Sequence, residues 1–326
     1  PWLKKTRELY AGQGISGENS STWTTRGSLK KHFGDNFPKL PYKSYSFDHH
    51  LSHTAAGFQT SPYEQATVVV IDAIGEWDTI TIWDAEYNQN GNAVYKKLWS
   101  QRYPHSIGLY YSAMTGRIGL RPMDEEYILM GMAGWGRGVH AQTIHNAFVK
   151  DMQTAKFKQN LHIGVDSDFL KDAKDEDIAA STQRVVEKIL DFIMNKASKL
   201  GKSRNLVYAG GVALNCLYNR RLGSHFDNIW IMPNPGDCGS SLGAAALINK
   251  KQLNWIDPYL GTDIPGKYPV PQLINALEIN KIVGVANGRA EFGPRALGNR
   301  SLLADPRGNE IKDQVNEIKR RQKFRP

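Results

Sequence analysis

Apolar residues along this chain recur with the period of a strand in some segments and with the period of a helix in others, which is the pattern of an α/β protein. Residues 66–71 are apolar except for Thr67, so they predict a strand buried on both faces, which ends in an acidic turn at 72–76. Two further strands are predicted at 79–83 and 94–99. The stretch 88–92 between them is rich in Asn and contains Gly, which predicts the turn of a hairpin.

The remaining segments predict alternating helices and strands. Residues 107–149 have a helical pattern that small residues interrupt at 131–136, and residues 178–200 predict a long amphipathic helix. Shorter elements are predicted as well, namely strands at 43–47, 205–209 and 228–232 and a helix at 212–221. A strand, an acidic turn and a hairpin in this order begin the phosphate-handling lobe of the actin, hexokinase and heat-shock ATPase superfamily. We therefore expect an α/β fold with actin/hexokinase-like (ribonuclease H-like) lobes.

A domain boundary is predicted where four prolines interrupt the periodicity at 257–271. It divides the chain into a first domain at 1–260 and the beginning of a second at 261–326. The second part is short for a core of its own, and only one strand, at 281–286, is predicted in it. The chain is therefore expected to be a piece of a longer protein.

Composition is that of a globular protein, with 40% hydrophobic residues among 326. No run reaches the roughly 18 apolar residues that a membrane span needs, so a membrane protein is not expected. The first residues have no apolar signal core, and export is not expected either. Cys216 and Cys238 are too few for a disulfide framework, which favours a reducing cytoplasm.

The net charge of +9 raises the question of nucleic acid. Part of the excess is a basic tail, formed by Lys312, Lys319, Arg320, Arg321, Lys323 and Arg325. Such a tail is usually a solvated helix face, and no aromatic-interleaved RNA platform or DNA-reading motif accompanies it. Anionic small molecules explain the charge as well, so no nucleic-acid partner is expected.

Two motifs carry candidate metal ligands. His49 and His53 are four residues apart where a strand is predicted to give way to a helix, so their imidazoles share one helical face. Asp237 lies in a Gly-rich turn that opens another helix, where backbone N–H groups favour an anion. Each motif alone also has an ordinary explanation, a helix surface with hydrogen-bonded imidazoles or a tight strand-to-helix turn. Together they suggest an enzyme that handles a metal and a phosphorylated ligand.

A third motif alternates Arg with Gly and Pro at 291–301. Guanidinium groups bind phosphate oxygens in a bidentate way, although a stretch of this kind is most often a solvated loop.

Taken together, the motifs resemble those of the O-carbamoyltransferase family, which includes the tobramycin, cephamycin and nodulation-factor carbamoyltransferases. The resemblance runs from about His49 to the last residue. It rests on seven motifs in the order of the family: His49-His50-x-x-His53, Asp72-x-x-Gly75-Glu76-Trp77, His105-Ser106-x-Gly108, Met130-Gly131-x-Ala133, Gly210-Gly211-Val212-Ala213-Leu214-Asn215, Pro235-Gly236-Asp237-x-Gly239 and Gly293-Pro294-Arg295-Ala296-Leu297-Gly298-x-Arg300-Ser301.

The resemblance implies ATP-dependent transfer of a carbamoyl group from carbamoyl phosphate, through carbamoyl adenylate, to a hydroxyl of a sugar or small metabolite. The large domain would resemble tRNA threonylcarbamoyl-adenosine transferases. The small C-terminal domain would resemble threonylcarbamoyl-adenylate synthases. A divalent metal, iron in known members, would be held by His49, His53 and Asp237, which would also be the catalytic residues. His50 would point elsewhere and pack or support the site.

The same resemblance implies a nucleotide site between two lobes. Its residues would be Asp72, Gly75, Glu76, Gly210, Gly211, Asn215 and Gly236, and Arg289, Arg295 and Arg300 would hold the phosphates of ATP or carbamoyl phosphate. Close strand-to-helix packing is the alternative explanation for Gly210 and Gly211. Two positions depart from the family: Ala73 replaces its usual Gly, and Ile128 replaces its usual Lys. Either change could alter phosphate handling or be neutral.

Two other interpretations remain open. The chain could be a threonylcarbamoyl transferase acting on tRNA, although that family lacks the third motif. It could also be a non-catalytic nucleotide-binding remnant. Neither the acceptor nor the oligomeric state can be predicted from the sequence, which allows a homodimer.

Overall fold

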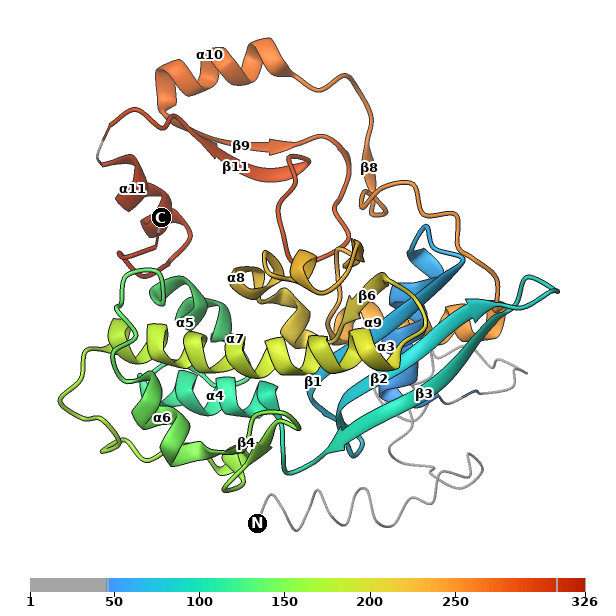
Figure 1. The fold of residues 1–326 in the computed structure, drawn as a ribbon. Helices are drawn as coiled ribbons and strands as arrows, with labels where there is room; N and C mark the ends of the chain where they lie inside the picture. Colours follow the sequence, from blue (N-terminus) through green and yellow to red (C-terminus); the bar gives the residue numbers. More distant parts are fainter. Residues whose placement is uncertain (1–44, 46, 309, 326) are drawn as a thin grey trace, which may run out of the picture. The chain divides into compact units, whose positions relative to one another are not determined.

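The computed structural model describes residues 45, 47–308 and 310–325 (Figure 1). The contacts between residues divide the chain into two units, 1–49 and 50–326, and nearly all described residues belong to the second. The strand predicted at 43–47 falls mostly outside the described residues. Tyr45 and Phe47, which are described, have no strand geometry.

A five-stranded mixed sheet is the centre of the second unit, and its strand order is β3-β2-β1-β6-β7. The strands are β1 Gln65–Gly75, β2 Asp78–Tyr87, β3 Ala93–Arg102, β6 Asn205–Ala209 and β7 Asn228–Trp230. β1, β2 and β3 pair antiparallel, whereas β6 is parallel to β1 and β7 is parallel to β6. The α/β fold is confirmed, and three antiparallel strands followed by two parallel ones are the arrangement expected of a ribonuclease H-like lobe.

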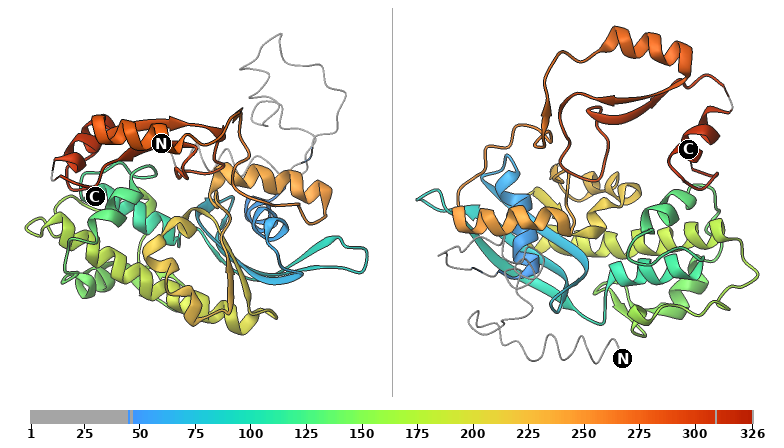
Figure 2. Two further views of the ribbon diagram at one scale, coloured as in Figure 1. Left: turned by 90° about the horizontal axis from the view of Figure 1, so that it is seen from above. Right: turned by 180° about the vertical axis from the view of Figure 1, so that it is seen from behind.

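Helices cover both faces of this sheet because β1 is apolar on both sides. On one face, Val69 and Ile71 pack against a layer of four helices. These helices are α4 Ile107–Arg117, α5 Glu126–Met132, α6 Ala141–Phe148 and α7 Asp175–Leu200. On the other face, Val68 and Val70 pack against Phe58 of α3 His49–Thr60. Next to α3 lies α9 Asp237–Asn249, as the views in Figure 2 show.

The sequence prediction was wrong for residues 212–221, which do not form one helix. They contain most of a 3₁₀ turn at Gly211–Leu214 and a short helix α8 at Cys216–Asn219, and a second 3₁₀ turn follows them at Leu222–Ser224. The interruption has a local cause. The Asn215 side chain accepts a hydrogen bond from the Tyr218 backbone N–H, so it caps a new helix and ends the previous turn.

The C-terminal segment contains more regular structure than the single predicted strand. β9 Ile282–Ala286 pairs antiparallel with β11 Arg300–Ala304, which the sequence did not reveal. The neighbouring elements are β8 Asp263–Ile264, α10 Val270–Asn280, β10 Gly288–Arg289 and α11 Ile311–Ile318. Smaller elements elsewhere are β4 Val149–Asp151, β5 Lys156–Phe157 and a 3₁₀ turn at Leu161–Ile163.

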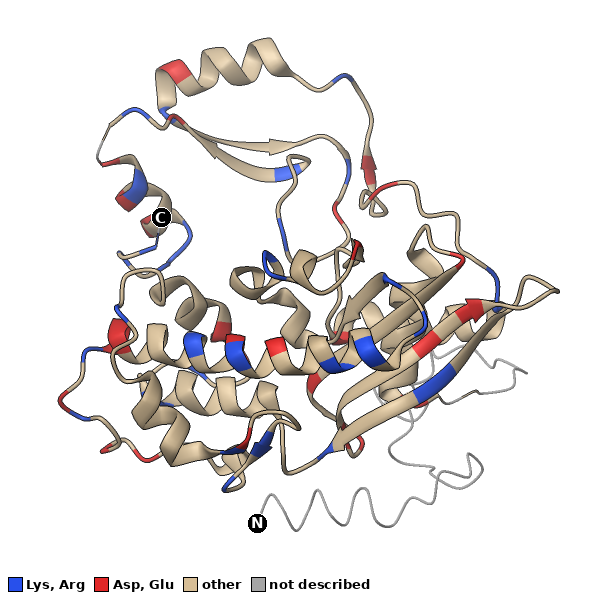
Figure 3. Cartoon of the chain, in the orientation of Figure 1, with Lys and Arg blue, Asp and Glu red and all other residues tan. Residues whose placement is uncertain are grey.

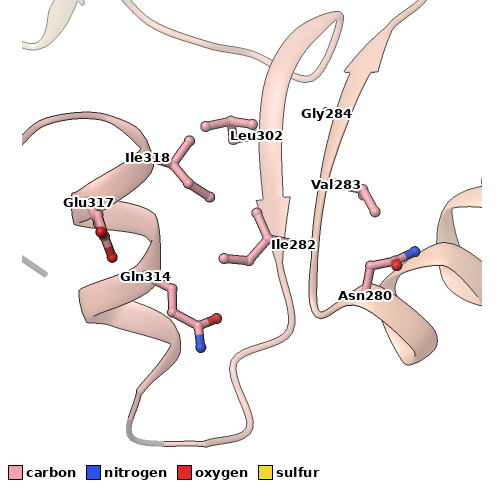
Figure 4. A pocket seen from close by; sticks show the side chains of 8 residues that line it. All are labelled: Asn280, Ile282, Val283, Gly284, Leu302, Gln314, Glu317 and Ile318. Carbon is pink, nitrogen blue, oxygen red and sulfur yellow. The ribbon is translucent and has the colours of Figure 1, made fainter.

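A cavity of about 640 Å³ lies against the β9–β11 pair and α11 (Figure 4). Its lining mixes apolar and polar side chains and comprises Asn280, Ile282, Val283, Gly284, Leu302, Gln314, Glu317 and Ile318. None of these residues is a cation that would hold a phosphate. Among the described helices, none is long and apolar enough to cross a membrane.

Candidate metal centre

α3 brings two imidazoles to the C-terminal part of β1, the central strand of the sheet. His49 is its first residue and His53 lies one turn later, so both point from the same face. His53 is buried, with 1% of its surface exposed. Its Nε2 atom lies 3.1 Å from Oδ2 of Asp72 and 3.3 Å from Oδ1 of Asp237.

Two carboxylates from separate elements complete this group. Asp72 belongs to β1, at the point where the pairing of β1 with β2 becomes irregular. The Ser106 hydroxyl, which caps α4, donates to the backbone carbonyl of Ala73 at 2.7 Å and so holds this part of β1 in place. Asp237 is the first residue of α9, and its side chain is 71% exposed. The group is therefore buried at His53 and open to solvent at Asp237.

The two histidines and two aspartates form a cluster, the metal group, that can hold one cation. A ligand atom from each of His49, His53, Asp72 and Asp237 lies within 4.8 Å of the others. Bonds of about 2.0–2.2 Å from imidazole nitrogen or carboxylate oxygen place ligands at such separations around one ion. Two nitrogens with two oxygens suit iron, zinc or manganese better than calcium or magnesium. The structure thus brings together the three predicted ligands and adds Asp72, which the sequence had suggested for nucleotide binding.

His50 points away from this group. Its Nδ1 atom lies 2.8 Å from the hydroxyl oxygen of Thr81 on β2, and the side chain is buried. The residue thus fixes α3 against the sheet.

Glycines of two turns lie beside the metal group. Gly210 has φ +88°, and a Cβ there would lie only 2.7 Å from the backbone carbonyl carbon of Ile71. A Cβ at Gly211 would lie 3.2 Å from Oδ1 of Asp72, and one at Gly236 would lie 3.9 Å from the Cα of Gly211. The backbone of the turn after β6 therefore lies close to β1 and to the start of α9, at positions where a side chain would have little room.

The other residues predicted for nucleotide binding have different positions. Gly75 and Glu76 form the turn between β1 and β2, where Gly75 pairs with Asp78. Asn215 is buried, and its amide exchanges two hydrogen bonds of 3.0 Å with Gln183 of α7. The structure therefore uses the Asn215 side chain to join α8 to α7.

The three arginines of the third motif are not equivalent. Arg300 donates to backbone carbonyls of the surrounding loops, including those of Asn287 at 3.1 Å and Thr262 at 2.8 Å. Its guanidinium therefore holds the loops together. Arg289 and Arg295 are exposed and remain the better candidates for phosphate binding.

The basic tail lies near the third motif, although the sequence alone assigned no site to it. Burial and the neighbouring Arg325 lower the pKa of Arg321, and Arg295 of the third motif adds to this effect. Burial, Arg321 and Arg325 likewise lower the pKa of Lys319. In the part of the chain that the structure describes, none of these four cations forms an ion pair with a carboxylate. Lys and Arg are blue in Figure 3, where they recur along this segment. Such a concentration of cations favours an anion.

We expect the stability of the loop that contains the third motif to depend on pH, because the Glu291 carboxylate accepts hydrogen bonds from the backbone of this loop. Burial alone would raise the pKa of Glu291, but backbone N–H groups, among them those of Leu297, Asn299 and Arg300, donate to its carboxylate and lower the pKa to about 2. This stabilisation is complete above the ordinary value of 4.5 and is lost as pH falls toward 2. NMR titration should show the amide signals of Leu297 and Asn299 shifting in that range. Glu291→Gln should abolish the shift, and an unchanged titration would contradict the assignment.

A strand-and-helix scaffold that gathers two imidazoles and two carboxylates defines an α/β protein with a candidate metal site. Comparisons with known proteins give its family. Residues 36–246 match the family model described as carbamoyltransferase N-terminus, and residues 274–326 match that described as carbamoyltransferase C-terminus. The chain belongs to the carbamoyltransferase family.

Similar proteins support this assignment. The chain is 32% identical to uncharacterized protein sll1178 of Synechocystis, covering 86% of this chain and 54% of that protein. It is 30% identical to nodulation protein U of Bradyrhizobium diazoefficiens, covering 88% and 58%, and 28% identical to nodulation protein NolO of the same organism, covering 86% and 57%. It thus spans somewhat more than half the length of these relatives. Among solved structures, HypF of T. kodakarensis matches with 12% identity and a TM-score of 0.39, over 68% of this chain and 38% of that one.

Proposed function

We propose that this chain takes part in ATP-dependent O-carbamoylation, in which the carbamoyl group of carbamoyl phosphate reaches a hydroxyl of a sugar or small metabolite through carbamoyl adenylate. The observation that carries the proposal is the four-residue metal group in a chain of the carbamoyltransferase family. In balanced form, carbamoyl phosphate, ATP and water give carbamoyl adenylate, orthophosphate and pyrophosphate. The acceptor hydroxyl then attacks the carbamoyl carbon and loses its proton. The bond between this carbon and the phosphate oxygen breaks, and AMP leaves.

In this proposal His49, His53, Asp72 and Asp237 hold a divalent ion, with iron as the candidate suggested by the family resemblance. Such an ion supplies Lewis-acid polarisation of an oxygen on which charge develops. The residues of the chain orient it: His53 and Asp72 are buried and fixed, whereas Asp237 faces solvent. The open side of the site therefore lies at Asp237, where the substrate would enter.

Phosphate binding is assigned to two features. Gly210 and Gly211 are packed against Ile71 and Asp72 of β1, whereas the nearest atom to a Cβ at Gly236 would be 3.9 Å away, so the start of α9 after Gly236 is the place that favours an anion. Arg289, Arg295 and the cations that follow α11 provide the positive charge for ATP or carbamoyl phosphate.

The two family matches, at 36–246 and 274–326, support the division into domains at residues 260 and 261. The two free cysteines support a cytoplasmic location.

The test is incubation of the protein with Fe(II), ATP, radiolabelled carbamoyl phosphate and a fractionated cell extract. We expect pyrophosphate, AMP and a labelled carbamoylated acceptor in equal amounts. Asp237→Asn should greatly reduce their formation, whereas Asp168→Asn, which changes a carboxylate outside the metal group, should not. Label on tRNA would favour a threonylcarbamoyl transferase-like enzyme instead. ATP binding without AMP formation would favour a nucleotide-binding remnant.

A further inference from the structure

Helix α3, which carries His53, lies so close to α9 that the backbones of the two helices are in contact. Gly243 of α9 is buried against α3, and a Cβ there would lie 2.6 Å from the carbonyl carbon of Ser52 and 3.0 Å from the backbone N of Ala56. Both are fixed atoms of a helix, so neither can move aside as a side chain would. Ser52 immediately precedes His53, and Gly243 lies in the same helix as Asp237. The closeness of the two helices therefore governs the distance between the His53 imidazole and the Asp237 carboxylate.

α3 approaches the sheet in a similar way on its other side. Gly57 lies one helical turn after His53, and a Cβ there would lie 2.5 Å from Cγ1 of Val207 in β6. β6 pairs with β1, which carries Asp72. The space left by Gly57 therefore governs how closely His53 lies to Asp72.

A buried amide fixes the end of α3. The side chain of Gln59 has no exposed surface. Its Nε2 donates to the carbonyls of Ala246 at 2.9 Å and Lys251 at 2.7 Å, and its Oε1 accepts from the Tyr95 hydroxyl at 2.8 Å. These bonds join α3 to the end of α9 and to β3. Sliding between the helices is thereby restrained, so that a change in spacing is passed on to the metal group.

We propose that Gly243 and Gly57 are positioning residues, which seat α3 between α9 and the sheet at the spacing that the metal group requires. The inference rests on the proposed metal role of His49, His53, Asp72 and Asp237. Metal–ligand distances tolerate only about 0.2 Å. A methyl group at either glycine would move α3 by more than this, while the ligands themselves stay chemically intact.

Cobalt(II) is the probe, because its visible absorption reports both affinity and the number of ligands. We expect Gly243→Ala and Gly57→Ala each to weaken Co(II) binding at least about 10-fold, as loss of supporting contacts does at metal sites, and to alter the absorption band. Gly223→Ala is the matched control, because nothing lies within 4 Å of a Cβ at that position. Its affinity and spectrum should equal those of the unmodified protein.

A second pair of variants separates positioning from general damage. Val207→Ala removes the atom that a Cβ at Gly57 would strike, so Gly57→Ala with Val207→Ala should recover Co(II) affinity to within about 3-fold and restore the spectrum. If Gly243→Ala does not fold, this pair decides the question. A folded double variant without recovery, or single variants that bind like the unmodified protein, would overturn the inference. Absence of Co(II) binding by the unmodified protein would instead overturn the proposed function.

Discussion

Replacing His53 with Ala should weaken divalent-metal binding by more than about 100-fold, the upper end of what supporting contacts alone contribute. The reason is geometric, since Nε2 of His53 lies within 3.3 Å of both Asp72 and Asp237 and its loss leaves two carboxylates without their common neighbour. Isothermal titration with Fe(II) or Co(II) under anaerobic conditions measures the effect. The matched control is His145→Ala, because His145 is a half-buried residue of α6 and lies outside the metal group. Equal affinities for the two variants would rule out the proposed site.

Replacing Gly210 with Ala should destabilise the protein by about 3 kcal/mol or more. Gly210 has φ +88° and ψ 165°, a backbone conformation that is essentially restricted to glycine and costs another residue about 1–3 kcal/mol, and the added methyl would also strike the Ile71 backbone. The measurement is the shift of the urea midpoint. Gly164→Ala is the matched control, since its φ of +89° nearly equals the +88° of Gly210 and nothing lies within 4 Å of its Cβ.

The two variants separate conformational strain from a steric clash. Gly164→Ala should cost only the backbone strain of about 1–3 kcal/mol, because Gly164 has nearly the same φ and ψ angles as Gly210, and the difference between the two shifts measures the close approach of the turn to β1. Similar shifts would show that Gly210 is needed only for its φ angle. Its proximity to β1 would then not be a source of stability.

Most of the central sheet was predictable because its signal is local. Residues 66–71 and 178–200 are long periodic runs, and the structure has β1 and α7 over these segments, with each element longer by a few residues. β11 was missed because it follows the Gly- and Pro-rich motif and is defined by pairing with β9. Residues 212–221 were taken as one helix because their apolar pattern hides the cap that Asn215 supplies.

Sequence spacing suggested that His49 and His53 share one helical face, and the family resemblance added Asp237 at the start of another helix as the third ligand. The placement of Asp72 was not readable. Its neighbours in sequence suggest a turn for phosphate, and its contact with His53, at 3.1 Å between Oδ2 and Nε2, depends on the packing of α3 against the sheet. Likewise Arg300 looked like a phosphate ligand, but its partners are carbonyls brought in from residues as distant as Thr262.

The edges of the five-stranded sheet have a further consequence. β7, at one edge, has only three residues, and β3, at the other, carries Lys96, Lys97 and Arg102. Short or charged edge strands resist pairing with strands of another molecule. Among the described strands, the sheet therefore offers no template for strand addition or edge-to-edge aggregation. We therefore expect an association of two copies through the described residues to use helix or loop surfaces and not to continue this sheet from one subunit into the next.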